Sequence, residues 1–190
     1  MSKLTVGFAM TGSFCMFEIA IKQMEKLVEI GYNIIPIMSF NAFNLDTKFG
    51  KAADFRNRVE EICGRKIINS IPDAEPIGPQ KLTDVMLIAP CTGNTLAKLC
   101  RAVTDTSVTM AAKAHLRTQR PLVLALATND ALGASAQNLG RALNTKNVYF
   151  VPLRQDDPEN KPTSLVCDFE KISETLTAAL ENKQIQPIFV

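Results

Sequence analysis

The sequence contains a single histidine, His115, and its five cysteines include no closely spaced pair. A zinc ion needs three or four Cys, His or carboxylate ligands in a compact set. This scarcity of ligands disfavours a Cys/His zinc site, and we expect no metal. An odd number of scattered cysteines also suits a reducing cytosol better than an oxidising compartment. These cysteines are Cys15, Cys63, Cys91, Cys100 and Cys167.

The chain also has little net charge and no long apolar run. Its 21 Lys and Arg residues nearly balance 19 Asp and Glu residues, which leaves a net charge of +2. A charge this small, without a clustered basic patch, argues against binding to nucleic acid or to an acidic membrane. Gly7, Gly12 and Ser13 interrupt the apolar residues near the amino terminus, so we expect neither a membrane span nor a signal peptide. The expected location is the cytoplasm.

The composition is typical of a globular domain, with 46% hydrophobic and 21% charged residues. A chain of 190 residues fits one domain with one sizeable core. We therefore expect a single domain over residues 1–190, in which residues 182–190 form a tail. The apolar end of this tail suits packing either on its own domain or on a neighbouring subunit.

Apolar runs of strand length alternate with patterns of helical period. The runs at 4–10, 33–38, 85–89, 122–127 and 148–151 are almost continuously apolar, as in strands that are buried on both faces. Apolar residues recur at steps of three and four between and after them, at 14–28, 55–62, 96–103 and 169–180. This alternation predicts an α/β fold, a Rossmann-like three-layer sandwich with a mostly parallel sheet of about six strands. Residues 66–71 are a candidate edge strand.

Small polar residues follow four of the predicted strands. The carboxyl ends of parallel strands lie at one edge of a sheet, where the next helices present free N–H groups and the positive ends of their dipoles. We therefore expect a nucleotide phosphate to bind at this edge. The loops are Thr11, Gly12 and Ser13; Ser39 and Phe40; Pro90, Cys91, Thr92, Gly93, Asn94 and Thr95; and Thr128, Asn129 and Asp130.

Each loop also has a purely structural interpretation. Gly12 and Ser13 suit either a tight turn with a helix N-cap or close approach to a phosphate. Residues 92–95 suit either a capping turn or hydrogen bonds to a flavin ring and its ribityl chain. Cys91 is either a redox thiol or a packed side chain, and His115 is expected at the surface or at the edge of the core. The sequence has neither a GxGxxG nor a P-loop motif.

The segment from Ala89 to Lys98, together with Gly12, Ser13 and Ser39, resembles the flavin-binding pattern of the Cys-peptide decarboxylases and flavin prenyltransferases. The resemblance implies FMN as the cofactor, with bound phosphate alone or an empty site as alternatives in the purified protein. The decarboxylases' P-A-M-N-x-x-M segment is replaced by residues 128–133, and their active-site histidine has no counterpart before the strand at 85–89, so peptidyl-cysteine decarboxylation is disfavoured. The cofactor-binding candidates are Thr11, Gly12, Ser13, Ser39, Phe40, Pro90, Cys91, Thr92, Asn94, Thr95, Thr128 and Asn129.

Residues 46–50, 128–133 and 155–165 resemble the family of dipicolinate synthase B subunits, over nearly the whole chain. This resemblance implies a subunit that acts with an NAD(P)-type A subunit to oxidise a dihydrodipicolinate precursor to dipicolinate, in the mother cell during sporulation. It also implies a homo-oligomer, a trimer or a multiple of one. The alternative is a non-catalytic subunit that assembles or activates the A subunit. Flavin prenyl transfer is a weaker third hypothesis.

A dicarboxylate substrate needs cationic side chains near the flavin. Lys48 and Lys161 lie in the family-like segments and Arg154 directly precedes one, although each is equally well explained as a solvated charge. Asp130 or Asp156 either accepts the proton that is lost when the ring becomes aromatic or caps a turn. The predicted catalytic residues are Asp130, Lys48 and Arg154.

Overall fold

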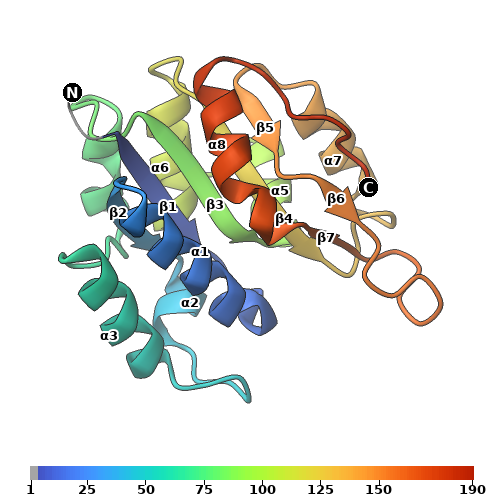
Figure 1. Cartoon of the computed structure of the whole chain (residues 1–190), viewed down its shortest axis with the longest axis horizontal. Helices are drawn as coiled ribbons and strands as arrows, with labels where there is room; N and C mark the ends of the chain where they lie inside the picture. Colours follow the sequence, from blue (N-terminus) through green and yellow to red (C-terminus); the bar gives the residue numbers. More distant parts are fainter. Residues whose placement is uncertain (1–3) are drawn as a thin grey trace.

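The computed structural model describes residues 4–190, which form a seven-stranded sheet with helices on both faces (Figure 1). The strand order is β2-β1-β3-β4-β7-β6, and β5 pairs with β4. Strands β1 to β5 run parallel to one another. The predicted three-layer α/β fold with a mostly parallel sheet is therefore confirmed. The parallel strands are β1 (Thr5–Met10), β2 (Asn33–Met38), β3 (Val85–Cys91), β4 (Leu122–Thr128) and β5 (Val148–Phe150).

Helices α1 and α8 cover one face of the sheet, and α5, α6 and α7 cover the other (Figure 1). On the inner side of α1 lie Phe17, Ile21 and Met24, each fully buried at the spacing that the sequence predicted. Full burial of such a side chain contributes about 1.5–3 kcal/mol. The helices are α1 (Phe17–Glu29), α2 (Phe40–Asn44), α3 (Ala52–Cys63), α4 (Ile71–Ala74), α5 (Gly93–Cys100), α6 (Ser107–Leu116), α7 (Ala136–Leu143) and α8 (Ile172–Leu180), with short 3-10 turns at Phe14–Met16, Glu75–Ile77 and Phe169–Lys171.

Two strands were not predicted from the sequence. Strands β6 (Leu153–Arg154) and β7 (Leu165–Cys167) are antiparallel to each other, and β7 is antiparallel to the end of β4. Strands of two and three residues are too short to produce a recognisable pattern of alternation. The long connection between them, residues 155–164, extends from the edge of the molecule (Figure 1).

The predicted edge strand at 66–71 is wrong. Only Ile68 pairs with β2, where its N–H donates to the carbonyl of Pro36 and its carbonyl accepts from the N–H of Met38, both at 2.9 Å. The next donor that a parallel ladder needs belongs to Pro36, which has no N–H group. The ladder therefore stops after one bridge.

The carboxyl-terminal tail packs on its own chain. The N–H of Leu153 donates to the carbonyl of Ile188 at 2.8 Å, and the N–H of Val190 donates to the carbonyl of Leu153 at 2.9 Å. The backbone groups of Ile188 and Val190 are therefore paired within their own domain and not with a neighbouring subunit.

His115 is buried in the core, and the expected position at the surface or core edge is wrong. Its ring is 1% exposed, with Nε2 2.9 Å from the carbonyl of Pro121 and Nδ1 2.8 Å from the hydroxyl of Thr83. Because a carbonyl only accepts, Nε2–H donates to Pro121 and Nδ1 accepts from Thr83. Burial lowers the pKa of His115 to about 4.

Among residues 4–190, no helix combines the length and apolar character that crossing a bilayer requires. The same residues hold no group of three or more His, Cys, Asp or Glu side chains placed to share a metal ion.

The buried histidine predicts a loss of stability in mild acid. Its pKa is lower in the folded chain, about 4, than the ordinary value of 6.5, so the unfolded state binds more protons between these values. The free energy of unfolding should therefore fall as the pH drops from 6.5 to 4, by at most about 3 kcal/mol from this group. Urea unfolding across this range measures the effect. His115→Gln cannot be protonated and should lose this part of the pH dependence; an unchanged slope would assign it to other groups.

Candidate functional site

Two adjoining hollows lie at the edge of the sheet where the parallel strands end. The larger, of about 490 Å³, is lined by the loops after β1, β3 and β4 and by the β6–β7 connection. The smaller, of about 270 Å³, is lined by the loops after β1, β2 and β3. Gly12, Thr92 and Asn94 line both hollows. The four loops predicted from the sequence are thus brought together around one region of the surface.

A buried threonine joins the loops after β1 and β3. Thr11 is 1% exposed, and its hydroxyl donates to the carbonyl of Pro90 at 2.8 Å and accepts from the N–H of Thr92 at 3.0 Å. The Thr92 hydroxyl in turn accepts from the N–H of Thr95 at 3.1 Å, which caps helix α5. These bonds hold the first turn of α5 against the end of β1.

The smaller hollow is lined by donors that the fold leaves free. Within residues 4–190, the N–H groups of Gly12, Phe40 and Asn94 have no acceptor. Ser39 caps α2 by accepting from the N–H of Ala42 at 3.3 Å, which leaves its hydroxyl hydrogen available. The amino-terminal end of α5 adds the positive end of a helix dipole. This combination suits an anion that only accepts hydrogen bonds.

One ammonium group lies at the smaller hollow. Lys98 lines it, and its Nζ is 2.8 Å from each carboxylate oxygen of Asp105. The pair lowers the pKa of Asp105 through the hydrogen bond from Lys98. Because Asp105 largely offsets the charge of Lys98, the hollow depends mainly on neutral donors.

The larger hollow combines apolar walls with both signs of charge. Phe14, Leu165 and Val166 contribute apolar surface, whereas Asp130, Asp156 and Lys161 contribute charge. A hydrogen bond from Ser164 lowers the pKa of Asp156, and Lys161, with its Nζ at 3.4 Å, adds to this effect. A flat ring with polar edges is compatible with such walls.

Asp130 is held in place by the turn that precedes α7. Its Oδ1 accepts from the N–H of Ala134 at 3.1 Å, and its Oδ2 accepts from the hydroxyl of Ser135 at 3.0 Å. Both carboxylate oxygens of Asp130 therefore stabilise this turn, as the capping interpretation predicts. Asp130 also lines the larger hollow.

Ser13 lines the larger hollow but does not cap the first helix, so that expectation is wrong. Its hydroxyl donates instead to the carbonyl of Ala127, at 2.8 Å, and no cap bond forms. Cys91 is fully buried and lines neither hollow; burial raises the pKa of its thiol far above the usual value. The thiol is packed and protonated. Pro90 also lines neither hollow, whereas Thr128 and Asn129 line the larger one.

Two predicted catalytic residues lie outside both hollows. The Lys48 ammonium is 5.2 Å from the centroid of the Phe49 ring. Arg154 lines a neighbouring hollow of about 450 Å³, which shares Met16, Asp156 and Val166 with the larger hollow. Both cations therefore lie beside the larger hollow but not among its lining residues.

Several lining residues were missed from the sequence. Asn41 and Thr106 line the smaller hollow, and Phe49 and Ser164 line the larger one. Phe49 and Ser164 lie inside the family-like segments 46–50 and 155–165, so the resemblance of these segments could have identified them as site candidates. Thr106 caps α6 and has no local signal for a site, because only the packing of α6 brings it there.

Comparisons with known proteins agree with this fold. A family model described as "Flavoprotein" matches residues 1–185. The B subunit of dipicolinate synthase from Bacillus subtilis (strain 168) is 45% identical over 185 residues, which cover 97% of this chain and 92% of that protein. The crystal structure of the dipicolinate synthase B subunit from Bacillus halodurans C superposes with a TM-score of 0.91 at 43% identity, covering 100% of this chain and 98% of that one.

A more distant structure shares only the fold. It is that of a dodecameric FMN-dependent Ubix-like decarboxylase from Escherichia coli O157:H7, with a TM-score of 0.64 and 23% identity. The match covers 78% of this chain and 80% of that one.

Two glycines of the site should respond differently to an added methyl group. At Gly93 a Cβ would lie 2.7 Å from Thr128 Oγ1 and 3.2 Å from Ser135 Oγ, whereas at Gly12 it would meet only the Phe14 ring, at 3.6 Å. We expect Gly93→Ala to cost about 1–3 kcal/mol through overpacking. Gly12→Ala, the matched control, should leave the melting temperature nearly unchanged. Thermal unfolding followed by circular dichroism checks both, and equal melting temperatures would contradict the close packing at Gly93.

Proposed function

The chain belongs to the flavoprotein family and, within it, to the dipicolinate synthase B subunits, and we propose that it binds FMN and acts with an NAD(P)-type A subunit to oxidise a dihydrodipicolinate precursor to dipicolinate during sporulation. The observation that carries this proposal is the smaller hollow. Three loops there present free N–H and hydroxyl donors beside the amino-terminal end of α5.

The residues of this hollow fit the phosphate of FMN. A phosphate dianion only accepts hydrogen bonds, and the hollow offers donors: the N–H groups of Gly12 and Asn94 and the hydroxyl of Ser39. Gly12 has open space where a Cβ would be, apart from the Phe14 ring, so its backbone is accessible. The adjoining larger hollow, with Thr128 and Asn129 at its polar edge, would hold the ring.

Family membership supports the cofactor and a homo-oligomeric state. The distant relative from Escherichia coli O157:H7 is described as FMN-dependent and dodecameric. A trimer or a multiple of one is consistent with that assembly.

When bound, FMN supplies a two-electron acceptor, and the chain supplies position and electrostatics. Aromatisation of the precursor releases a proton from its ring, and a carboxylate in the larger hollow accepts it. We assign this role to Asp130, because the carboxylate of Asp156 is already paired with Lys161, whose Nζ lies at 3.4 Å.

Lys161 is the cation that lines the larger hollow, so it is suited to pair with a substrate carboxylate. Lys48 and Arg154 lie outside both hollows. A catalytic role for either requires that the substrate also contact the segment that carries it.

A non-catalytic subunit that assembles or activates the A subunit is the second candidate. It is favoured by Asp130, because both carboxylate oxygens of this residue already accept hydrogen bonds within the turn before α7. Under this alternative the phosphate pocket is vestigial, and substitutions in the larger hollow should not slow product formation.

A matched pair of substitutions at Ser39 tests FMN binding. Asp and Asn both serve as helix N-caps, so Ser39→Asp and Ser39→Asn preserve the cap of α2 and differ mainly in charge. Ser39→Asp should weaken FMN binding by at least about tenfold because its carboxylate repels the phosphate. Ser39→Asn should bind nearly as the unmodified chain. Flavin absorbance titrations measure both affinities, and equal binding by the two variants would remove Ser39 from the phosphate site.

Ser13→Asp is a poorer test of the same site. Its carboxylate would face the carbonyl of Ala127 that now accepts from the Ser13 hydroxyl, so lost binding would not be separable from lost folding.

The proton-acceptor role is tested by Asp130→Asn against Asp156→Asn. In the complex with the A-type subunit, Asp130→Asn should slow dipicolinate formation by about 10²–10⁴-fold. Asp156→Asn should slow it by less than about tenfold. FMN affinity and melting temperature, measured in parallel, separate lost chemistry from lost binding or folding. Unchanged rates in both variants would favour the non-catalytic alternative.

A further inference from the structure

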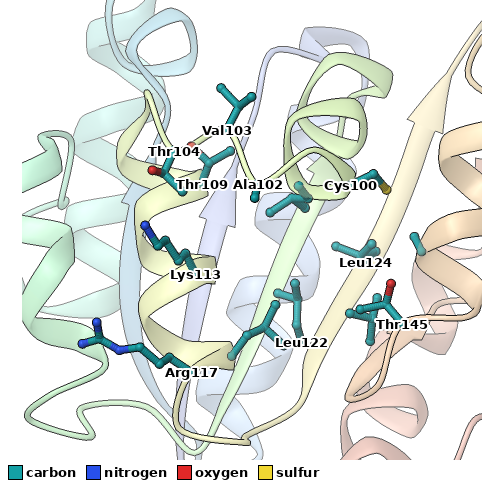
Figure 2. Close-up of a pocket in the computed structure, with 14 residues that line it drawn as sticks. Cys100, Ala102, Val103, Thr104, Thr109, Lys113, Arg117, Leu122, Leu124 and Thr145 are labelled. Carbon is teal, nitrogen blue, oxygen red and sulfur yellow. The ribbon is translucent and has the colours of Figure 1, made fainter.

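An apolar groove of about 430 Å³ lies between α5, α6 and α7, above β4 (Figure 2). It shares no lining residue with the two hollows of the FMN site. Its walls include Leu99 and Cys100 of α5 and Leu116 of α6, and Leu122 and Leu124 of β4 lie along its floor. We call it the α5–α7 groove.

The groove carries cations and no carboxylate. Its charged lining residues are Lys113 of α6 and Arg117, the C-cap of α6, and the charged ends of both point outward, away from Leu122 and Leu124 (Figure 2). In the described part of the chain, neither side chain forms an ion pair, whereas nearby Lys98 pairs with Asp105 and Arg120 lies 3.8 Å from Asp84. The two cations are therefore free to pair with groups outside this chain.

The wider surroundings of the groove are basic as well. Residues 93–148 contain seven Lys and Arg residues but two acidic residues, whereas the rest of the chain contains 14 basic and 17 acidic residues. The small net charge of the chain therefore averages over a segment whose own formal net charge is +5, since seven basic residues exceed two acidic ones by five. Arg141 and Arg101 are near enough to Cys100 for their charges to counter the rise that burial causes in the pKa of its thiol.

Part of the apolar surface at the groove is left in water. Val103, at its rim, is 40% exposed, and Ala102 beside it is also exposed. Covering such surface contributes about 25 cal/mol per Å². A ligand that fills the groove with apolar atoms and meets the cations with carboxylates would satisfy both features.

We propose that the α5–α7 groove binds an acidic segment of the A-type subunit, with apolar side chains of that segment in the groove and its carboxylates paired with Lys113 and Arg117. The identity of the partner rests on the proposed function. The groove accommodates a few apolar anchors, which commonly dominate such interfaces. A small dianion would engage the cations but leave the apolar floor uncovered. Opposite charge across the interface would also speed association.

Three substitutions test the proposal: Lys113→Glu, Arg117→Glu and Val103→Glu. Each changes a side chain that is exposed or at the rim, so the core should remain intact. Lys51→Glu is the matched control, because Lys51 is exposed at the start of α3 and lines neither the groove nor the FMN site. The probe is the purified A-type subunit, titrated by calorimetry against full-length chain at low and high salt.

Each groove substitution should weaken binding at least about tenfold. The control should change it by less than about twofold. Binding by the unmodified chain should weaken as salt rises, because the paired charges are screened. Every variant should have the FMN affinity and the circular dichroism spectrum of the unmodified chain. Such a match would show that the substitutions leave the fold intact.

Other results overturn the inference. If the groove variants bind the A-type subunit as tightly as the unmodified chain does, the A-type subunit binds elsewhere on this chain. The proposed partnership is then unaffected. A smaller oligomer of the groove variants in light scattering assigns the groove to a second copy of this chain. Failure of the unmodified chain to bind the A-type subunit removes both the inference and the proposed partnership, while FMN binding is judged separately by the Ser39 pair.

Discussion

The parallel pairing of β1 to β4 is the constraint on which the rest of the structure depends. These strands are buried on both faces, and each connection must cross a layer of helices before the next strand begins. Every carboxyl end therefore meets the others at one edge of the sheet. The Thr11 hydroxyl makes this meeting rigid, since it bonds to the loop after β3 through both Pro90 and Thr92.

The same residue types serve two purposes at this edge. The hydroxyls of Thr11 and Ser13 are used within the fold, on the carbonyls of Pro90 and Ala127. The hydroxyl hydrogen of Ser39 and the N–H of Asn94 stay free and line the smaller hollow. The proposed phosphate site thus consists of the donors that remain after the loops have been joined to one another.

Charge is distributed unevenly over the molecule. The charge of the proposed FMN site is nearly balanced, because Asp105 accompanies Lys98 at one hollow and Lys161 accompanies Asp156 at the other. The helical layer of α5 to α7 is basic, and its groove holds Lys113 and Arg117 without carboxylates. The site therefore selects a ligand by directed hydrogen bonds, whereas the groove is suited to attract an acidic surface over a longer range.

The sequence by itself determined the layers of the fold and the edge at which the site lies. Apolar runs of strand length and helical spacing are local patterns, and they predicted β1 to β5, α1, α3, α5 and α8. The four polar loops followed from the direction of parallel strands. Tertiary structure decided what each loop residue does, because its partner is distant in the chain: Ser13 bonds to Ala127, 114 residues away. The burial of His115, the short pairing of β6 with β7, and the positions of Lys48 and Arg154 outside the lining of the larger hollow likewise depend on packing between remote segments, which no local pattern encodes.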